Sequence, residues 1–344
     1  MSPSTHRGIL LMNLGSPDST DVRDVRSYLN EFLMDKRVID VPYLWRLLLV
    51  KGIITLFRAP RSAAAYRSIW TDKGSPLIDL TKQLQFAMQE LVPEPVEIAM
   101  RYGDPHPKVA FERLQKKISA LQEVVLVPLY PHYAMSSYET AIEYARKVHA
   151  DQGYNFKLRI VEPFFNQPDY VDALTQSIKP YLEQEFDHLL FSYHGIPERH
   201  VRKTDVTGRH CLQVKNCCTT PSEAHAYCYR HQIITTTTLV AEKLKIPVTK
   251  YSYSFQSRLG RDEWLKPYTA MRLEQMPSEG IKKLLIVCPA FISDCLETLE
   301  EIAIEGRESF LHAGGERFTF IPCLNVDQGW VRALKTIIYS SIKN

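Results

Sequence analysis

The chain has 344 residues, of which 45% are hydrophobic and 24% are charged, so its composition is that of a globular protein and not of a disordered one. The formal net charge of +3 is too small and too evenly spread to indicate a nucleic-acid partner. No apolar run approaches the roughly 18 residues of a membrane span, and the polar segment 1–8 is unlike a signal peptide. We therefore expect a cytoplasmic protein.

Apolar strands alternate with amphipathic helices through the first half of the chain. Gly8–Leu14 has the pattern of a buried strand, Gly15-Ser16-Pro17 interrupts it, and residues 18–33 have acidic caps and helical apolar spacing. The same alternation predicts strands at 96–100 and 124–129 and helices at 108–121 and 138–149. Strands that alternate with helices are typical of a parallel sheet.

The second half repeats this rhythm, with predicted strands at 157–161, 187–192, 247–253 and 282–287. A chain of this length usually forms more than one domain. We predict an α/β protein of two Rossmann-like lobes, each a parallel sheet flanked by helices, with the active-site cleft between them. The predicted lobes are residues 1–163 and residues 164–344, the latter with a cysteine-rich insertion at 205–232, and a terminal helix at 327–342 could pack on either lobe.

Two strand ends carry side chains suited to acid-base chemistry. Ser192-Tyr193-His194-Gly195-Ile196 closes one apolar run, and Ser293-Asp294-Cys295-Leu296-Glu297 follows another. Because open α/β sheets bind ligands at the carboxyl ends of their strands, His194 and Glu297 are predicted to face one cleft. Arg101, Tyr102, Tyr130 and Phe291 also follow predicted strands, although tyrosines and histidines are common at strand ends without any function.

An acidic row begins at Asp294 and continues with Glu297, Glu301 and Glu305 at helical spacing. Such a row could carry a divalent cation or protons. The alternative is structural, since Asp294 with Glu297 also has the pattern of a capping box, and acids in the first turn of a helix interact favourably with its dipole.

The chain has seven cysteines, and four of them, Cys211, Cys217, Cys218 and Cys228, lie in one short segment. In a reducing compartment they are better interpreted as thiols or metal ligands than as disulfides. Four thiolates can hold a [2Fe-2S] cluster. Zinc is disfavoured because the usual C-x2-C pairs are missing, and a segment without metal remains an alternative.

Residues 43–57 are rich in leucine, isoleucine and aromatic side chains, interrupted by Arg46 and Lys51. This pattern suits an interfacial helix that touches a membrane or an apolar substrate. It equally suits an ordinary amphipathic helix whose leucines fill the core and whose basic residues are solvated.

Taken in order, six motifs closely resemble those of the ferrochelatases across nearly the whole chain. The motifs are Leu11-Met12-Asn13-Leu14-Gly15-Ser16-Pro17, Met100-Arg101-Tyr102-Gly103, Pro128-Leu129-Tyr130-Pro131, Ser192-Tyr193-His194-Gly195-Ile196-Pro197, Phe255-Gln256-Ser257-Arg258-Leu259-Gly260 and Ser293-Asp294-Cys295-Leu296-Glu297-Thr298-Leu299-Glu300-Glu301. The resemblance implies insertion of Fe²⁺ into protoporphyrin IX or coproporphyrin with release of two protons, the last metallation step of haem synthesis. Metal entry then needs a distorted ring and acceptors for two pyrrole protons.

The resemblance also implies a role for each matching residue. His194 and Glu297 would contact the iron and accept protons, with Glu301, Glu305 and Asp294 as a proton or metal relay. The porphyrin would contact Leu14, Arg101, Tyr102, Tyr130 and Phe291, and 43–57 would form an apolar lip able to touch the inner face of the membrane. Cys211, Cys217, Cys218 and Cys228 resemble the iron-sulfur segment of some bacterial ferrochelatases.

Two positions depart from some relatives, because Arg258 replaces a tryptophan and Cys295 replaces a histidine. The acid-base requirements are also shared by chelatases that load cobalt into other tetrapyrroles, and by the pocket of a porphyrin or metal carrier that does not turn over. The sequence does not distinguish protoporphyrin from coproporphyrin, and it leaves the oligomeric state open.

Overall fold

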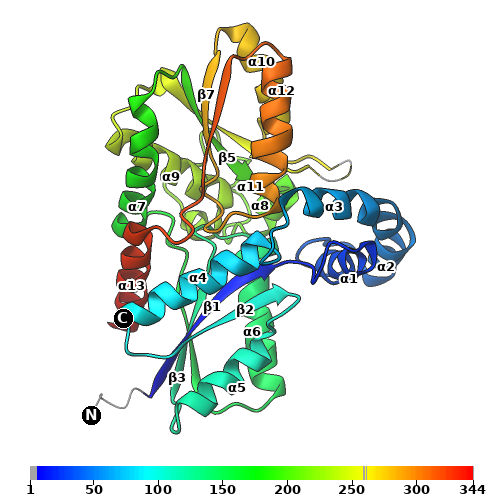
Figure 1. Ribbon diagram of the computed structural model, residues 1–344, viewed down its shortest axis with the longest axis vertical. Coiled ribbons are helices and arrows are strands. Elements are labelled where there is room, and N and C mark those ends of the chain that lie inside the picture. The colour runs from blue at the N-terminus through cyan, green and yellow to red at the C-terminus, as the bar shows by residue number, and fades with distance from the viewer. Residues whose placement is uncertain (1–5, 259, 261, 344) are drawn as a thin grey trace. The chain divides into compact units, whose positions relative to one another are not determined.

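The computed structural model describes residues 6–258, 260 and 262–343, so Leu259 of the Phe255–Gly260 motif lies outside the described residues. The chain divides into two compact units. Unit 1 comprises Met1–Leu129, Met135–Glu162 and Lys335–Asn344, and unit 2 comprises Tyr130–Ala134 and Pro163–Leu334. Each unit contains a parallel four-stranded sheet with helices packed against it (Figure 1). The predicted α/β fold class is confirmed.

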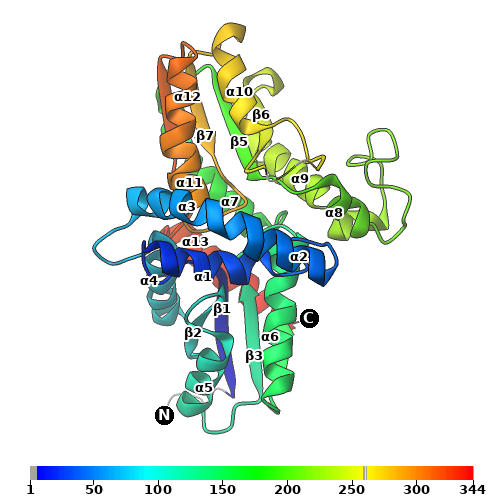
Figure 2. The same ribbon diagram turned by 90° about the vertical axis from the view of Figure 1, so that its right-hand side faces the viewer.

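The sheet of unit 1 has the strand order β2-β1-β3-β4. Its strands are β1 (Arg7–Gly15), β2 (Val96–Tyr102), β3 (Glu123–Pro128) and β4 (Lys157–Ile160). Its helices are α1 (Val22–Leu33), α2 (Tyr43–Leu49), η1 (Val50–Ile54), α3 (Thr55–Ile69), α4 (Pro76–Leu91), α5 (Pro107–Lys117), η2 (Met135–Glu139) and α6 (Thr140–Asp151). Figures 1 and 2 show α5 and α6 flanking this sheet, and both helices contact β2.

The sheet of unit 2 has the equivalent order, β6-β5-β7-β8. Its strands are β5 (His188–His194), β6 (Tyr251–Gln256), β7 (Lys283–Val287) and β8 (Arg317–Ile321). Its helical segments are α7 (Pro168–Ile178), η3 (Lys179–Glu183), α8 (Glu198–Lys203), η4 (Glu223–Tyr227), α9 (Tyr229–Lys243), η5 (Val248–Lys250), α10 (Thr269–Gln275), η6 (Met276–Glu279), α11 (Leu296–Leu299), η7 (Glu301–Gly306) and α12 (Arg307–His312). The last helix, α13 (Gln328–Lys343), belongs to unit 2 through Leu334 and to unit 1 from Lys335.

The central strands are apolar because both faces of each sheet are covered. Residues 9–12 of β1 and 189–191 of β5 are completely buried, as expected for parallel strands between layers of helices. In unit 2, α10 and α12 pack side by side against the sheet, and their side chains join Ile286 and Ile302 in one hydrophobic cluster (Figure 2). The cluster anchors the apolar side of η7 in the core.

In each unit the chain passes from the first strand to one neighbour and later returns to the other side. The change of direction falls between β1 and β3 in unit 1, and between β5 and β7 in unit 2. Ligands of open α/β sheets bind beyond the carboxyl ends of the strands at such a point. Gly15 ends β1 there with a φ of 105°, and a Cβ atom at this position would lie 1.7 Å from the Tyr102 carbonyl oxygen.

Several predicted boundaries are wrong. The strand predicted at 247–253 starts only at Tyr251, because Val248–Lys250 forms a 3-10 turn after Pro247, which lacks a backbone N–H. The helix predicted from residue 18 begins at Val22. The edge strand β8, which pairs only with β7, has no counterpart in the prediction.

The helices predicted at 43–57 and from Asp294 also differ from the structure. The first consists of α2, the π-helical segment η1 and the start of α3. The second is a single short turn, α11, followed by the π-helix η7. Its capping box is formed by Cys295 and Thr298, so the predicted box of Asp294 with Glu297 is wrong.

Candidate active site

His194 is the last residue of β5, where the sheet of unit 2 ends. Its Nδ1 lies 2.7 Å from the Gly195 carbonyl oxygen, which can only accept a hydrogen bond, so Nδ1 carries the proton. In the neutral ring the lone pair is therefore on Nε2. The Tyr229 hydroxyl donates to the His194 carbonyl at 2.8 Å, and the Phe291 ring lies 6.3 Å from the imidazole between centroids. The imidazole is held in one orientation with a basic nitrogen available.

Gly195 is required immediately after this histidine. A Cβ atom at position 195 would lie 2.8 Å from the Gln256 carbonyl oxygen and 3.2 Å from the Trp264 ring. The Gly195 amide donates to that same carbonyl at 2.7 Å. A glycine therefore lets β5 and β6 remain close at the point where the histidine leaves the sheet.

The segment that follows β7 is fixed by a buried carboxylate. Asp294 Oδ1 accepts from the Thr298 hydroxyl at 2.9 Å, and Oδ2 accepts from the Asn325 side-chain amide at 2.7 Å. The Asp294 backbone amide in turn donates to the side-chain oxygen Oδ1 of Asn325 at 2.8 Å. These bonds set the direction in which α11 begins, and with it the position of Glu297.

Glu297 and Glu301 come from successive helical segments and share surroundings with His194. The Glu297 carbonyl accepts from the Gln256 side-chain amide at 2.8 Å. Burial raises the pKa of Glu301, and the negative charge of Glu297 adds to this, whereas hydrogen bonds from Ser257 and the His194 charge oppose it. The Glu301 carboxylate thus interacts electrostatically with both the imidazole of His194 and the carboxylate of Glu297.

The π-helical backbone changes the acidic row that the sequence predicted. The Glu305 amide donates to the Glu300 carbonyl at 2.9 Å, a bond of the wider π type. Glu301 is half-buried, whereas Glu305 is exposed. Single π turns inside helices are frequent at functional sites because they move a side chain off the regular α-helical register.

In unit 1, the predicted porphyrin residues include a closed electrostatic network. Arg101 donates to Asp35 Oδ2 at 2.5 Å and to the Thr140 hydroxyl at 2.7 Å, and its guanidinium lies over the rings of Tyr102 and Tyr144. The Tyr102 hydroxyl donates to the same Asp35 oxygen at 3.0 Å. Although burial raises the pKa of Asp35, its hydrogen bonds and Arg101 lower it to a net value below the usual one. Asp35 was missed by the sequence analysis because no motif distinguishes it.

The remaining predicted porphyrin residues have different exposures. Leu14 and Phe291 are half-buried, and Tyr130 is buried. Leu14 belongs to unit 1, and the other two belong to unit 2.

The cysteines of the 205–232 segment lie close together, and Cys211 and Cys218 both contact Cys228. The Cys218 thiol donates to Cys228, and this bond, with further ones from the His231 amide and Cys211, lowers the pKa of Cys228 to about 6 despite burial. The Cys217 sulfur accepts from the Leu212 amide at 3.4 Å. Amide N–H groups that point at sulfur stabilise thiolates.

Two further features hold this segment in place. The Asp205 carboxylate accepts from the amides of Thr207, His210 and Cys211 at 2.7–2.9 Å. Three histidines bond to neighbouring carbonyl groups: His210 and His225 reach the Cys217 oxygen, and His231 reaches the Cys218 oxygen. In the described part of the chain, no group of three or more His, Cys, Asp or Glu side chains has the arrangement for holding a single metal ion.

The apolar lip residues 43–57 are oriented opposite to an ordinary amphipathic helix. The exposed fraction is 70% for Leu44, 69% for Trp45 and 78% for Phe57, while Arg46 is buried. The Arg46 guanidinium donates to the carbonyl groups of Ile39 and Val41. The alternative in which the leucines fill the core is therefore wrong. No helix in the described ranges is long and apolar enough to span a membrane.

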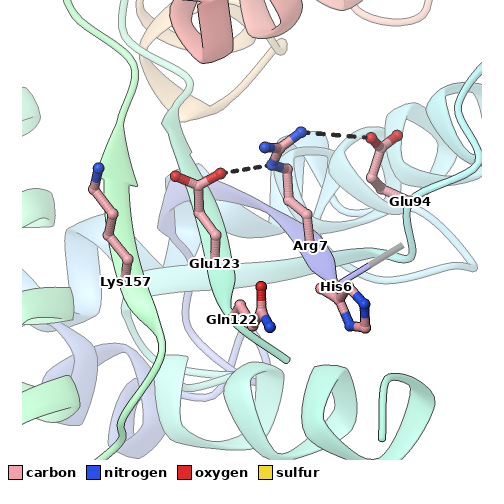
Figure 3. Close-up of a pocket in the computed structure, with 6 residues that line it drawn as sticks. All are labelled: His6, Arg7, Glu94, Gln122, Glu123 and Lys157. Carbon is pink, nitrogen blue, oxygen red and sulfur yellow. Dashed lines mark hydrogen bonds and ion pairs between the residues drawn. The ribbon is translucent and has the colours of Figure 1, made fainter. Parts of the chain in front are cut away.

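A separate cavity of about 470 Å³ lies at the opposite edge of the unit 1 sheet (Figure 3). It is lined by the first residues of β1, β3 and β4, where Arg7 donates to Glu123 at 2.6 Å. Arg159 donates to the other Glu123 oxygen at 2.8 Å, so this carboxylate is neutralised from two sides. The cavity therefore opens at the amino ends of the strands of unit 1, whereas Arg101 and Tyr102 lie at the carboxyl end of β2.

Two solved structures of chelatases have the same fold as this chain. The sirohydrochlorin chelatase SirB of Bacillus subtilis subspecies spizizenii, solved with cobalt, matches with a TM-score of 0.56 and 10% identity over 98% of this chain and 96% of that one. SirB from Bacillus subtilis with Fe³⁺ matches with a TM-score of 0.52 and 13% identity over 97% and 95% of the two chains. The chain thus has the chelatase fold.

Sequence comparison then identifies the family. The ferrochelatase family model matches residues 6–342. The chain is 51% identical to the ferrochelatase of Pseudomonas entomophila over 332 residues, covering 96% of this chain and 98% of the relative. It is 49% identical to that of Pseudomonas syringae pv. tomato over 334 residues, 97% of each chain. The chain belongs to the ferrochelatase family, and is accordingly a metal chelatase of haem biosynthesis with ferrous iron as a substrate.

Proposed function

We propose that this chain inserts Fe²⁺ into protoporphyrin IX or coproporphyrin and that His194 and Glu297 are the catalytic pair. The observation that carries the proposal is the geometry at the end of β6. Gln256 lies opposite His194 and donates its side-chain amide to the Glu297 carbonyl, and the next residue, Ser257, donates to Glu301. A free-base porphyrin must lose two pyrrole protons as the metal enters. An imidazole nitrogen and nearby carboxylates supply both the proton acceptors and the oxygen and nitrogen donors that Fe²⁺ accepts.

In this mechanism the neutral His194 accepts a pyrrole proton at Nε2, because Nδ1 is already committed to the Gly195 carbonyl. Glu297 contacts the incoming iron or takes the second proton. Glu301 exchanges protons with this pair, since its raised pKa brings its protonated form closer to neutral pH. Glu305, being exposed, connects the relay to solvent. The bonds of Asp294 favour an anchoring role for this residue over direct proton transfer.

We assign porphyrin contacts to Leu14, Arg101, Tyr102, Tyr130 and Phe291, as the family resemblance implies. The bonds of Arg101 to Asp35 and Thr140 hold its guanidinium group in one orientation. The exposed apolar lip 43–57 suits either the porphyrin face or the surface of a membrane, and the basic residues Lys51 and Arg58 are also exposed there. We therefore propose a cytoplasmic enzyme with peripheral membrane contact.

The test is anaerobic incubation of the purified protein with Fe²⁺ or Zn²⁺ and either protoporphyrin IX or coproporphyrin, followed by visible absorption. We expect the bands of the free-base porphyrin to be replaced by those of a metalloporphyrin for at least one pair. Anionic phospholipid vesicles added in a parallel arm should sediment with the protein and lose it at high salt if the lip docks on them. Absence of metallation with every pair would contradict the enzymatic role and favour the carrier alternative.

We further propose that Cys211, Cys217, Cys218 and Cys228 hold a [2Fe-2S] cluster. The buried thiols, the depressed pKa of Cys228 and the amide N–H groups directed at two of the sulfurs support this proposal. Burial and the contact with Cys228 raise the pKa of Cys211 and Cys218, so these two thiols would release their protons as the cluster binds. A bound cluster would supply a redox-active crosslink of the segment. Metal insertion itself transfers no electrons, so we assign the cysteines a structural or sensory role.

Analysis of bound iron and sulfide tests this second proposal. Protein purified without oxygen should be coloured and contain about two iron and two sulfide ions per chain. Cys228→Ser should remove both the colour and the iron, because the most acidic thiol of the group is lost. Cys323→Ser, which changes a cysteine outside the segment, is the control and should keep them. A colourless parent protein without iron would dismiss the cluster, and stoichiometric zinc would replace it with the zinc alternative.

A further inference from the structure

Ser257 has an unusual backbone conformation at the end of β6. Its φ is 62°, in the left-handed region that glycine favours and that costs other residues energy. Residues held in such a conformation tend to occur where a neighbouring interaction requires it.

The turn allows one residue to hold both oxygens of a half-buried carboxylate. The Ser257 amide donates to Glu301 Oε1 at 2.7 Å, and the Ser257 hydroxyl donates to Glu301 Oε2. Hydrogen bonds to a charged acceptor are stronger and more directional than neutral ones. Glu301 can consequently not rotate about its last torsion without losing at least one of these bonds.

The preceding residue ties the same turn to the rest of the site. The Gln256 side-chain amide donates from Nε2 to the Glu297 carbonyl at 2.8 Å, while the Ser192 hydroxyl donates to the Gln256 side-chain oxygen at 2.8 Å. Gln256 also lies opposite His194 in the parallel pairing of β5 with β6. The dipeptide Gln256-Ser257 therefore connects the histidine strand to both acidic segments.

The opposite side of η7 is held in place by the hydrophobic core, independently of the Ser257–Glu301 hydrogen bonds. Ile302, the neighbour of Glu301, is 1% exposed and belongs to the hydrophobic cluster with Phe310 and Leu273. Because the backbone of η7 is fixed by this packing, loss of the serine frees the Glu301 side chain rather than moving the helix.

We propose that Ser257 is a positioning residue for metal insertion, whose left-handed backbone and hydroxyl group hold the Glu301 carboxylate in the orientation that serves His194 and Glu297. This inference rests on the proposed function, in which Glu301 belongs to the proton relay. Ser257 itself neither accepts a proton nor contacts the reacting atoms in this role.

Ser257→Gly separates positioning from stability. Glycine keeps the amide donor and adopts a positive φ without cost, but it has no hydroxyl. We expect a melting temperature no lower than that of the parent protein, together with a kcat reduced about 10- to 100-fold, as for loss of one hydrogen bond to a charged group. The KM for porphyrin should stay within twofold. A crystal structure of the variant should show the Glu301 carboxylate displaced.

Rescue by a donor completes the test. Ser257→Ala should lose kcat like the glycine variant, and Ser257→Asn, which tolerates a left-handed backbone and presents an amide N–H, should recover part of it. Ser19→Ala is the matched control, because the Ser19 hydroxyl also donates to a carboxylate, Asp24 at 2.6 Å, but in unit 1. The control should keep the parental kcat.

The outcomes distinguish this inference from the function on which it rests. A kcat for Ser257→Gly within twofold of the parent, while Glu301→Gln is impaired, would overturn the positioning role alone. If Glu301→Gln had the parental activity, Glu301 would not belong to the relay, and the proposed positioning of its carboxylate by Ser257 would have no function. A fall in kcat that matches a fall in melting temperature, with no recovery in Ser257→Asn, would assign Ser257 a purely structural role.

Discussion

Replacement of His194 by alanine is expected to abolish metal insertion while leaving porphyrin binding intact. The basic nitrogen of this imidazole is Nε2, since the Gly195 carbonyl holds the proton on Nδ1. Loss of a positioned general base usually lowers the rate by about 10²- to 10⁴-fold. The measurement is kcat for metalloporphyrin formation in parallel with porphyrin affinity from fluorescence quenching.

The matched control lies on the same strand. His188 begins β5 and hydrogen-bonds the Ser252 hydroxyl at 2.7 Å, so His188→Gln changes a histidine at the opposite end from the candidate site. The folded fraction of this variant should retain the parental kcat. Equal losses in the two variants would indicate a general effect on unit 2, and a fully active His194→Ala protein would refute the catalytic assignment.

The second large effect is a loss of stability in mild acid, caused by buried neutral histidines. The His132 residue is 2% exposed, its Nε2 lies 2.9 Å from the Thr236 hydroxyl, and its Nδ1 has no hydrogen-bond partner among the described residues. Burial lowers the pKa of His132 to about 3. Burial, together with the charge of Arg272, lowers the pKa of His188 to about 4.

The sign follows from comparing the folded and unfolded chains. An unfolded histidine binds a proton below a pKa of about 6.5, whereas these two folded histidines stay neutral until the pH is far lower. Stability is therefore unaffected by them above about pH 7 and falls as the pH drops toward 4. Between pH 7.5 and pH 5 each contributes a loss of about 2 kcal/mol in the free energy of unfolding.

Urea unfolding at the two pH values measures this loss. His132→Gln should reduce the loss of unfolding free energy between the two pH values by about 2 kcal/mol, whatever its effect at pH 7.5, because the contribution of one neutral histidine is gone. His312→Gln, at an exposed position of α12, is the control and should leave the dependence unchanged. An unfolding free energy that is the same at both pH values in the parent protein would show that neither histidine is held neutral.

The sequence predicted the fold class because its strands are unusually apolar. Segments such as 9–12 and 189–191 are buried on both faces, and such continuous apolar runs can be recognised as strands from the sequence alone. The strand ends at His194 and after β7 followed from the same pattern. Left-handed turns at residues other than glycine could not be predicted: Ser257 has a positive φ, and serine does not indicate this conformation in a sequence. The π turn of η7 likewise has no sequence signature.

Pairings between distant residues were equally out of reach. Arg101 has the charge expected of a ligand for a carboxylate, and only the structure shows that Asp35 occupies this role within the protein. The lip is the reverse case, because its composition allowed two interpretations and the burial of Arg46 distinguishes them. Local periodicity reports which face of an element is apolar, but not what covers that face.

The repeated strand order has a consequence for how the two halves can change. Each unit carries its own reversal point, yet the charges at the edge of unit 1 are closed into the network around Asp35, whereas unit 2 gathers an imidazole and two carboxylates. The same strand order therefore supports two different sets of polar side chains, so a substitution in the Asp35 network of unit 1 leaves the acid-base groups of unit 2 in place.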